Sequence, residues 1–433
     1  MSSKQPKPNS KKPPLNGQFR LKRKRPRPTA TSSKTAKAPE VQSSPDTIIN
    51  ETSQKKKNPN KAESKEKPSS ASLPVGSCVG VSERFKKICR IGEGTYGIVY
   101  KAEDRQNPGD FVALKRCIPH HEGTDGYPMT ALREILSLRL LQQHPNVVTL
   151  RTDIGMVAVS KSDNYLVFEY CEHELAQLLD FHYTKQRNPR NTKGGIFGGS
   201  NNNPKSPFTE ANVKTLMTHL LSALECMHDH RLIHRDIKVS NLLYSASGHL
   251  KLADFGLSRS LPSQEPLQDG GYHLTPNVVS LWYRPPELLL GSKTYSQAID
   301  MWGAGCVFAE LLLGYPLWSG KSESEQMEAI FSTVGPPSVE SWPNLLTMPL
   351  IQDGSVKLEK YAKVRTSSMP LLDSFSYLAT SGLMLLANLL HYDANGKRLT
   401  ASQALQSSYF ASEPLPTPPA EMPKFKSLHT AKK

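Results

Sequence analysis

The chain has 433 residues, with 54 lysines and arginines against 39 aspartates and glutamates, giving a formal net charge of +15. That length allows two domains, or one two-lobed enzyme with tails. No stretch reaches the apolar length of a membrane span, and we predict no signal peptide because the N-terminal region lacks an apolar segment. Six scattered cysteines without a CxxC pair favour reduced thiols over a disulfide framework or a zinc site.

The positive charge is concentrated near the N-terminus. Residues 1–70 hold 18 lysines and arginines, 5 acidic residues and a single aromatic, Phe19, for a net charge of +13. Such a segment cannot bury enough apolar surface to fold, so we predict a disordered basic tail over residues 1–80. The run RLKRKRPRP at 20–28 favours a nuclear localisation signal over a solvated charge run, with the cytoplasm left open as a second location. No direct nucleic-acid specificity is expected, because no aromatics are interleaved for base stacking.

Residues 83–118 alternate apolar and polar side chains in short runs with glycine breaks, which predicts strands. They contain the GxGxxG spacing of Gly92, Gly94 and Gly97. A dinucleotide site uses the same spacing but needs a helix at the third glycine. Here IVYKA continues as a strand, which favours a loop between strands that covers a triphosphate. A plain hairpin turn is the alternative.

Residues 128–143 (PMTALREILSLRLLQQ) change to helical spacing. We expect four apolar residues on one face: Leu132, Ile135, Leu138 and Leu141. Lys115, in the strand segment FVALK, is predicted to point inward. An unpaired buried lysine is costly, so it needs a carboxylate or phosphate partner, and Glu134 on the helix is the natural one. A surface lysine and an unrelated glutamate are the alternative.

After the apolar run at 164–171 the pattern is mainly helical. We therefore predict an α+β, two-lobed fold with a small antiparallel β lobe and one helix over 85–170, and a larger, mainly α lobe over 171–410. Residues 184–206, rich in Gly, Asn and Lys, predict a long surface loop. The segment 411–433 is predicted to be a Pro-rich, basic C-terminal tail that packs only in part.

The string HRDIKVSN at 234–241 places Asp236 and Asn241 five residues apart. LLYSASGHLKLA, which reads as a hairpin with a Ser-Gly turn, then leads to Asp254 in DFG. That hairpin can return Asp254 to the first two residues. An Asp, an Asn and an Asp in one cleft provide oxygen ligands for Mg²⁺ and a base for a hydroxyl, as phosphoryl transfer from ATP requires.

From these positions we assign catalytic roles. Asp236 is the candidate base that accepts the substrate hydroxyl proton, and Lys238 the group that steadies the γ-phosphate. Asn241 and Asp254 are the candidate metal ligands, and Lys115 with Glu134 directs an ammonium at the α- and β-phosphates. The alternative for Asp236 is a structural cap in an inactive fold.

In this order the three strings resemble the protein kinase signature set. PMTALRE, GEGTYG, YLVFEYCEHEL, DFGLSR and VVSLWYRPPELLLG are similar to the cyclin-dependent kinases over roughly residues 85–410. A lysine at position 238 is typical of the Ser/Thr-directed kinases. The RPPELLLG string and the hinge-like segment YLVFEYCEHEL resemble those of the transcription-associated members. The resemblance implies ATP and Mg²⁺ as cofactors. It also implies a cyclin partner, an upstream activating kinase, and protein substrates with Ser-Pro or Thr-Pro sites.

The resemblance also implies a nucleotide site. Ile91, Val99, Ala113, Phe168 and Leu243 would enclose the adenine, the backbone of Glu169 and Cys171 would bond it, and Glu174 would lie near the ribose. Core packing is the other reading of the apolar members. The full set of implied ATP-binding residues is Ile91, Gly92, Glu93, Gly94, Thr95, Tyr96, Gly97, Ile98, Val99, Ala113, Lys115, Glu169, Cys171, Glu174 and Leu243.

Regulation follows from the same resemblance. Thr275 is the expected phosphorylation site of the activation segment, with its phosphate bound by Arg133, Arg235 and Arg259. Phosphate on Thr95 or Tyr96 would repel ATP, although both read equally well as ordinary loop residues. Structural roles are implied for three further residues: a Glu287–Arg398 ion pair and a brace at Asp300.

Substrate choice is implied by Val278, Val279 and Arg284. A strained turn at the two valines, with its carbonyl held by Arg284, would favour proline after the phosphoacceptor. The chain's own Ser44-Pro45 and Thr417-Pro418 are then candidate autophosphorylation sites. Two alternatives stay open: a cyclin-independent proline-directed kinase, against which PMTALRE argues, and a pseudokinase scaffold, against which the intact catalytic set argues.

Overall fold

The structure, a computed structural model, describes residues 78–94, 97–117, 128–141, 144–154, 157–159, 163–187, 206–262, 266–267, 271–275, 278–362 and 370–428. The basic tail up to residue 77 lies outside these ranges. So do Thr95, Tyr96 and residues 188–205 of the expected surface loop.

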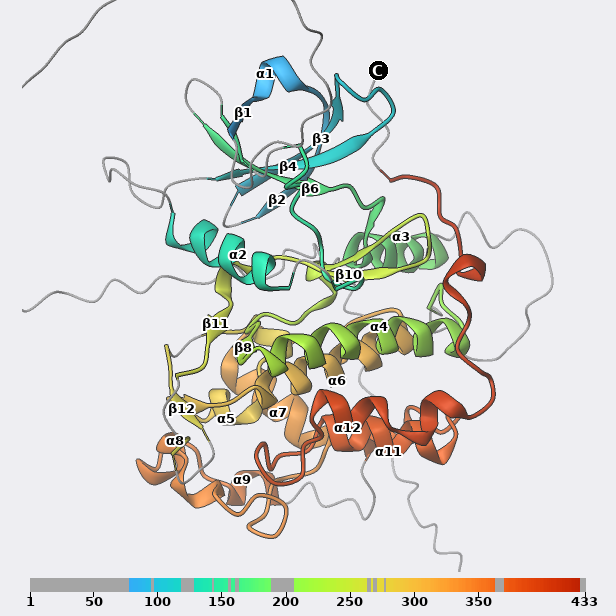
Figure 1. Cartoon of the computed structure of the whole chain (residues 1–433). Coiled ribbons are helices and arrows are strands. Elements are labelled where there is room, and N and C mark those ends of the chain that lie inside the picture. Colours follow the sequence, from blue (N-terminus) through green and yellow to red (C-terminus); the bar gives the residue numbers. More distant parts are fainter. Residues whose placement is uncertain are drawn as a thin grey trace, which may run out of the picture.

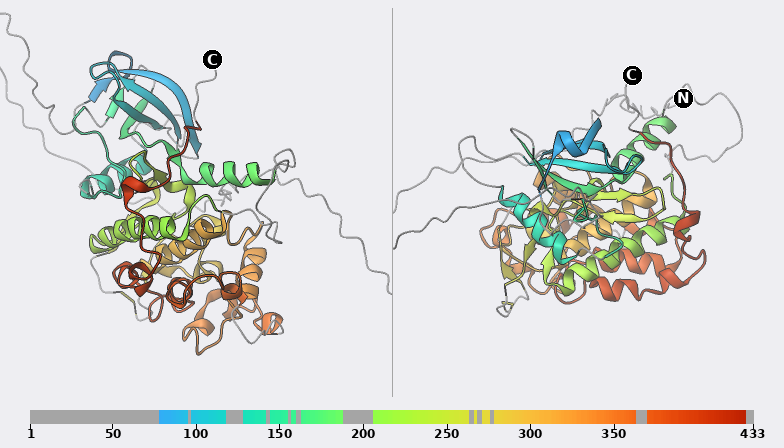
Figure 2. Two further views of the ribbon diagram at one scale, coloured as in Figure 1. Left: turned by 90° about the vertical axis from the view of Figure 1, so that its right-hand side faces the viewer. Right: turned by 45° about the horizontal axis from the view of Figure 1, so that its top comes forward.

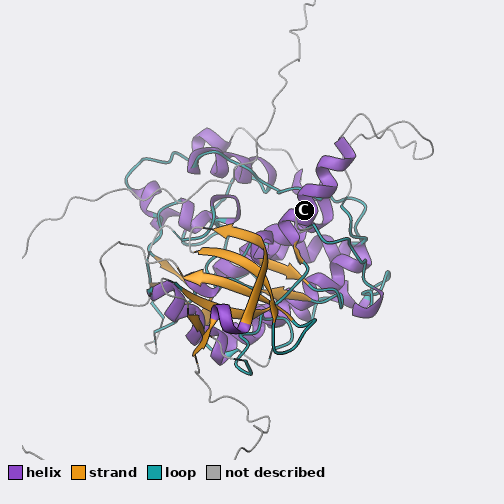
Figure 3. Ribbon diagram, turned by 90° about the horizontal axis from the view of Figure 1, so that it is seen from above, coloured by secondary structure: helices purple, strands orange, loops and turns teal. Residues whose placement is uncertain are grey.

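The smaller lobe is a twisted six-stranded sheet with strand order β1-β5-β6-β4-β3-β2 (Figure 1). Its strands are β1 (Cys78–Gly80), β2 (Phe85–Gly94), β3 (Gly97–Asp104), β4 (Phe111–Cys117), β5 (Val157–Val159) and β6 (Asn164–Glu169). Every pairing is antiparallel except that of β1 with β5, which is parallel. Residues 78–80, expected in the tail, are therefore part of the sheet. The view from above shows these strands lying over the helical lobe (Figure 3).

Alternation along the strands explains this lobe's core. In β4, Val112 and Leu114 are fully buried, whereas Ala113 and Lys115 between and after them are half-buried on the opposite face. The first pair packs with Phe85 and Val167 in a small core. The other face is thus left for Ala113 and Lys115, the two residues expected at the nucleotide.

Helix α2 (Met129–Leu140) lies against the sheet and confirms the predicted helix, but its orientation corrects the expected face. Leu138 and Leu141 are buried as expected, whereas Leu132 is exposed. The inward residues of α2 are Ala131, Glu134, Ser137 and Leu138. The helix carries apolar residues on two sides, so periodicity alone could not identify the inner one.

The larger lobe is mainly helical. Its helices are α3 (Leu175–Arg187), α4 (Glu210–Asp229), α5 (Pro286–Leu289), α6 (Ala298–Leu313), α7 (Glu323–Thr333), α8 (Pro349–Gln352), α9 (Glu359–Ala362), α10 (Pro370–Asp373), α11 (Thr380–Leu389) and α12 (Ala401–Leu405). The short helix α1 (Val81–Arg84) belongs to the smaller lobe. The expected surface loop was placed to start at 184, but α3 continues to Arg187.

Short strands of the larger lobe carry the loops of the site. They are β7 (His173–Glu174), β8 (Leu232–Ile233), β9 (Leu242–Tyr244), β10 (Leu250–Leu252), β11 (Arg259–Ser260), β12 (Tyr272–His273) and β13 (Thr294–Tyr295). β9 and β10 form the predicted hairpin.

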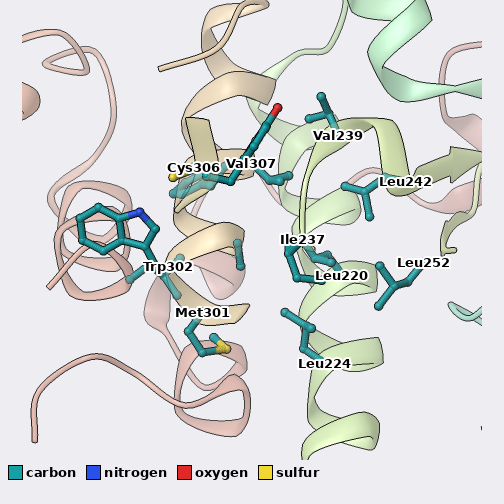
Figure 4. Packing of buried hydrophobic residues seen from close by; sticks show 14 of the residues in the cluster. Leu220, Leu224, Ile237, Val239, Leu242, Leu252, Met301, Trp302, Cys306 and Val307 are labelled. Atoms are coloured by element: carbon teal, nitrogen blue, oxygen red, sulfur yellow. The ribbon is translucent and has the colours of Figure 1, made fainter. Parts of the chain in front are cut away.

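The core of the larger lobe lies between α4 and α6. Leu220 and Leu224 of α4, Ile237 of the following loop and Met301 and Val307 of α6 are all essentially inaccessible to solvent (Figure 4). A capping box between Thr209 and Asn212 starts α4. No helix in the described ranges is both long and apolar enough to cross a membrane.

Candidate active site

The loop from β8 to β9 carries Asp236, which is 5% exposed. Ser280 donates to its Oδ1 through both Oγ (2.8 Å) and the backbone N–H (3.2 Å). Lys238 forms an ion pair with Oδ2, and Asn241 Nδ2 donates to the same oxygen at 3.1 Å. Lys238 Nζ also donates to Ser280 Oγ at 3.0 Å. The carboxylate of the candidate base Asp236 therefore contacts both Lys238, the lysine expected to steady the phosphate, and Ser280 of the activation segment.

A buried carboxylate fixes this loop from below. Asp300 at the start of α6 accepts from the backbone N–H groups of His234 (2.8 Å) and Arg235 (2.9 Å), so the sequence expectation of a brace is correct. Arg235 has φ 67°, a conformation that costs a non-glycine residue about 1–3 kcal/mol. The two bonds to Asp300 hold it there and aim the following Asp236.

The β9–β10 hairpin returns the chain to the loop, as predicted. The N–H of Ala253 donates to the carbonyl of Asn241 at 2.9 Å, which places Asp254 beside Asn241. Asp254 also has a positive φ of 67°. Two non-glycine residues in the left-handed region thus lie at the two ends of this site.

These residues suit a hard cation. Both hydrogen bonds of Asn241 Nδ2 go to Asp236, and no described residue donates to its Oδ1, so that oxygen is available as a ligand. The carboxylate of Asp254 is partly exposed. In the described part of the chain no group of three His, Cys, Asp or Glu residues could hold a metal by itself. Two protein oxygens plus substrate phosphates and waters are what Mg²⁺ commonly uses.

Lys115 lies between two carboxylates. Its Nζ is 2.7 Å from Glu134 Oε1 and 2.9 Å from Asp254 Oδ1. Burial by itself would lower the pKa of Lys115, but the charges of Asp254 and Glu134 outweigh it and raise that pKa. Burial alone would raise the pKa of Asp254, but the charge and hydrogen bond of Lys115, together with other nearby charges, outweigh burial and hold that pKa below its usual value. At Glu134, which also contacts the Lys115 ammonium, burial has the larger effect and raises the pKa. Lys115 thus stays charged beside Asp254, the candidate metal ligand.

The glycine-rich strands cover this site. Gly92 pairs with Val99, Glu93 with Ile98, and Gly94 with Gly97, and the turn between them is outside the described residues. At Gly97 an added Cβ would lie 2.1 Å from the carbonyl oxygen of Arg116, so only glycine fits. Residues of the expected set that are half-buried here are Ile91, Gly92, Ile98 and Val99, and Glu93 is exposed.

The residues expected around the adenine and ribose belong to three pairs of neighbouring strands, β3–β4, β4–β6 and β7–β9. Val99 pairs with Lys115, Ala113 with Phe168, and Glu174 with Leu243. Cys171 is buried, and burial raises the pKa of its thiol, which therefore stays protonated. The Glu169 side chain binds Lys251 and the N–H of Thr149 through Oε1, and its backbone N–H donates to the Thr149 carbonyl at 3.0 Å.

Sequence reasoning missed a contact between α2 and the DFG segment. Ser137 and Ser258 share a buried hydroxyl bond of 2.7 Å, and the Phe255 ring lies edge-on to His234 at 5.0 Å. Phe255 is fully buried. The position of α2, and hence of Glu134, is thereby coupled to Asp254. A polar serine on the inner face of an apolar helix was the available signal.

The activation segment brings only some of the expected arginines to Thr275. Arg259 Nη1 is 3.5 Å from Thr275 Oγ1, and the threonine is exposed. Arg235 bonds the hydroxyl of Tyr295 at 3.1 Å, and that hydroxyl donates to the Thr275 carbonyl at 2.8 Å. Arg133 is half-buried on α2, and its guanidinium has no partner among the described residues. In the same part of the chain none of the three arginines is paired with a carboxylate.

The strained turn implied after this segment is present. Val279 has φ 69°, and its carbonyl accepts from Arg284 Nη2 at 3.0 Å and Nε at 3.3 Å. Arg284 in turn pairs with Glu323 at the start of α7, which sequence reasoning missed. Burial lowers the pKa of Arg284, and Glu323 opposes that shift. The Glu287–Arg398 ion pair is also present, at 2.7 Å.

The comparisons agree with this geometry. The protein kinase domain family model matches residues 85–410. Human cyclin-dependent kinase 10 is 41% identical over 351 residues, covering 81% of this chain and 86% of that protein. Human cyclin-dependent kinase 11B is 40% identical over 342 residues, covering 79% of this chain but 38% of that protein. Cyclin-dependent kinase G-2 of Oryza sativa subsp. indica is 40% identical over 355 residues, or 81% and 45% of the two chains.

A solved structure shows the same fold. The crystal structure of the yeast RNA Pol II CTD kinase CTDK-1 complex matches with a TM-score of 0.59 and 34% identity, covering 78% of this chain and 95% of that one. The two-lobed architecture, the assembled catalytic loop and the relatives lead to one conclusion: the chain is a Ser/Thr protein kinase of the cyclin-dependent kinase family.

Proposed function

We propose that this kinase depends on a cyclin and transfers the γ-phosphate of ATP to Ser-Pro and Thr-Pro sites in proteins. Two adjacent features carry the proposal: Ser280 donates its backbone N–H to the Asp236 carboxylate, and the carbonyl of the preceding Val279 is turned onto Arg284. The first provides acid–base chemistry, and the second selects the residue after the phosphoacceptor. The likeness to the yeast RNA Pol II CTD kinase supports a role in transcription over one in the cell cycle.

In the reaction, Asp236 accepts the proton of the substrate hydroxyl, an effect worth about 10²–10⁴-fold. Lys238, held between Asp236 and Ser280, meets the negative charge that develops on the transferred group. Lys115, kept charged by its two carboxylates, binds the remaining phosphates. Asn241 and Asp254 would hold Mg²⁺, which neutralises phosphate charge when bound. Every group invoked by a kinase mechanism is present, which disfavours a pseudokinase.

Proline selection follows from the Val279 carbonyl. Because this carbonyl bonds Arg284, it is not available to the backbone N–H that follows the phosphoacceptor. An ordinary residue then leaves that N–H unsatisfied at a cost of about 1–3 kcal/mol, whereas proline has no N–H to lose. We expect wild-type kcat/KM to be about 10 to 100 times higher for Ser-Pro than for Ser-Ala peptides.

Glu323 provides the test. Glu323→Gln removes the charge that orients Arg284, so the Val279 peptide can relax and the Ser-Pro to Ser-Ala ratio should fall about fivefold or more. The Ser-Pro to Ser-Ala ratio is the readout, because a general loss of folding or activity would lower the rates on both peptides equally. Glu325→Gln, in the same turn of α7, is the matched control because Glu325 contacts the N–H of Lys321 and not Arg284. An unchanged ratio in Glu323→Gln would contradict this reading, and equal wild-type rates would contradict proline selection itself.

The cyclin proposal rests on the outer face of α2. Met129, Leu132, Leu136 and Leu140 are 60%, 38%, 67% and 51% exposed, and their spacing of three or four residues forms one apolar stripe. The inner face of the same helix carries Glu134, bonded to Lys115. A protein that covers the stripe would hold α2 in the position where that bond exists. An exposed apolar stripe of this kind is typical of an interaction surface.

An upstream kinase is proposed to modify Thr275. The threonine is exposed. Arg259 lies within hydrogen-bond distance of it, and Arg235 is linked to it through the hydroxyl of Tyr295. A phosphate would supply the negative charge that these guanidinium groups lack among the described residues, and so order the segment next to Val278.

We propose that the basic tail directs the protein to the nucleus. Deleting residues 1–70 removes 13 of the 15 net positive charges and should move the protein out of the nucleus, as seen by fluorescence of a tagged chain. Peptide phosphorylation should be unchanged. A deletion of residues 29–70 keeps the run at 20–28 and should stay nuclear. A nuclear signal that survives the longer deletion would assign import to a partner or to another basic stretch.

The two autophosphorylation candidates stay predictions. Ser44 is outside the described residues. Thr417 is half-buried, and its Oγ1 accepts from Asn212 Nδ2 at 2.9 Å, so modification there requires that segment to leave the lobe.

A further inference from the structure

The chain does not leave the kinase lobe where the family match ends at residue 410. Residues 412–428, here called the C-terminal strap, run from the base of the larger lobe up to the hinge side of the smaller lobe (Figures 1 and 2). Thr215 Oγ1 donates to the Thr417 carbonyl at 2.6 Å, and Tyr244 donates through its hydroxyl to the Pro423 carbonyl at 2.7 Å. The tail, expected to pack only in part, is bonded to the larger lobe at Thr417 and Pro423.

The hairpin between β9 and β10 is shaped to accept the strap. Gly248 at its turn has φ 81°, and an added Cβ would lie 2.0 Å from the Pro419 carbonyl oxygen and 2.8 Å from Met422 Cβ. Met422 itself is only 3% exposed. The strap therefore passes at backbone contact distance over a turn that needs glycine for both its conformation and its lack of a side chain.

The strap ends in an aromatic anchor. The ring of Phe425 packs edge-on against four rings of the larger lobe, at centroid distances of 5.5–6.0 Å: those of His173, His182, Phe208 and Tyr244. Such edge-to-face pairs are favourable beyond the apolar area that they bury. The Phe425 carbonyl also contacts His173 Nε2 at 3.2 Å. Phe425 thus anchors this end of the strap to the larger lobe.

The anchor packs on one face of the short β7–β9 ladder. In that ladder His173 pairs with Tyr244, and the next pair is Glu174 with Leu243. Successive side chains of a strand point to opposite faces. His173 and Tyr244 therefore face Phe425, and Glu174 and Leu243 face the other way, where the ribose and adenine are expected. One thin ladder separates the strap from the nucleotide site.

We infer that Phe425 is a positioning residue for nucleotide binding: it supports the back of the β7–β9 ladder, whose front holds the nucleotide. The inference rests on the proposed ATP site. β7 is the edge strand of the three-stranded sheet β10-β9-β7 and is held there by only two residue pairs, so its position depends on packing from behind. Without the ring, a gap of aromatic size opens behind His173. The ladder can then shift away from the nucleotide, which lowers affinity without touching Asp236 or Lys115.

The test measures Mg-ATP binding to the full-length chain by calorimetry, which needs neither a cyclin nor turnover. Phe425→Ala should raise the Kd about tenfold. Phe425→Leu keeps an apolar side chain without a ring and should give a smaller increase, which also provides a result if the alanine variant does not fold. Phe410→Ala is the matched control, because Phe410 is also a partly buried phenylalanine packed on the larger core, but it contacts Tyr409.

Two further readouts separate positioning from general destabilisation. Amide exchange of residues 173–174 and 242–244 should speed up in Phe425→Ala and not in Phe410→Ala. In the active kinase, KM for ATP should rise with the Kd while kcat at saturating ATP stays within about twofold.

Equal Kd values for wild type and Phe425→Ala, or an equal rise in Phe410→Ala, would overturn the inference and leave the proposed function in place. A wild-type chain that does not bind Mg-ATP would overturn both.

Discussion

Asp236→Asn should lower phosphoryl transfer by about 10²–10⁴-fold and leave Mg-ATP binding close to wild type. The amide cannot take up the hydroxyl proton. It also disturbs the local bonds, because both carboxylate oxygens accept from neighbouring donors and an asparagine keeps only one acceptor oxygen. Lys115 and its two carboxylates are unaffected, so the phosphates keep their charged partner. Single-turnover transfer and calorimetric nucleotide binding give the two numbers.

Asp254→Asn is the informative comparison, because it should weaken Mg²⁺-dependent nucleotide binding as well as transfer. Asp373→Asn, an exposed aspartate in α10, is the control for the substitution itself and should change neither. Wild-type turnover in Asp236→Asn would show that another group is the base.

Leu136→Glu should reduce the activation of the kinase by its cyclin by at least about tenfold. Leu136 is the most exposed residue of the α2 stripe, and a charge there would have to be desolvated against the partner. The inner face of α2 does not involve Leu136, so the folded chain and its Mg-ATP affinity should be unchanged. Activity is measured as a titration of the purified chain with its cyclin.

Leu346→Glu is the matched control, an equally large change at an exposed leucine of the larger lobe. It should titrate like wild type. Full activity of the unmodified chain without any partner, or equal activation of both variants, would contradict the assignment of the stripe.

The candidate catalytic groups could be located from the sequence because kinase chemistry repeats short strings in order. Asp236, Asn241 and Asp254 needed only a hairpin to bring them together, and LLYSASGHLKLA forms it. Lys115 and Glu134 were predictable for a different reason, since a buried ammonium requires a carboxylate. In both cases the signal is chemical necessity at a fixed spacing.

The remaining features depend on tertiary contacts, which leave at most a single unusual residue in the local pattern, such as Ser137 in an apolar helix. α2 turns Ser137 inward because Ser258 lies opposite, and so Leu132 faces outward despite its apolar character. Likewise, the composition of residues 411–433 indicates a tail, yet Phe425 finds an aromatic site built from separate parts of the larger lobe. Glu323 was missed because its partner Arg284 is 39 residues away.

The central claim is tested most directly by one assay. The full chain is purified with the cyclin that it captures from cells and given labelled ATP, Mg²⁺ and four peptides that differ only in the acceptor and the next residue: Ser-Pro, Thr-Pro, Ser-Ala and Tyr-Pro. We expect label in Ser-Pro and Thr-Pro, about 10 to 100 times less in Ser-Ala, and none in Tyr-Pro. In Asp236→Asn the label in Ser-Pro and Thr-Pro should fall by about 10²–10⁴-fold. A cyclin-bound wild-type chain that labels none of the four peptides, or that labels Ser-Ala and Ser-Pro equally, would contradict the account.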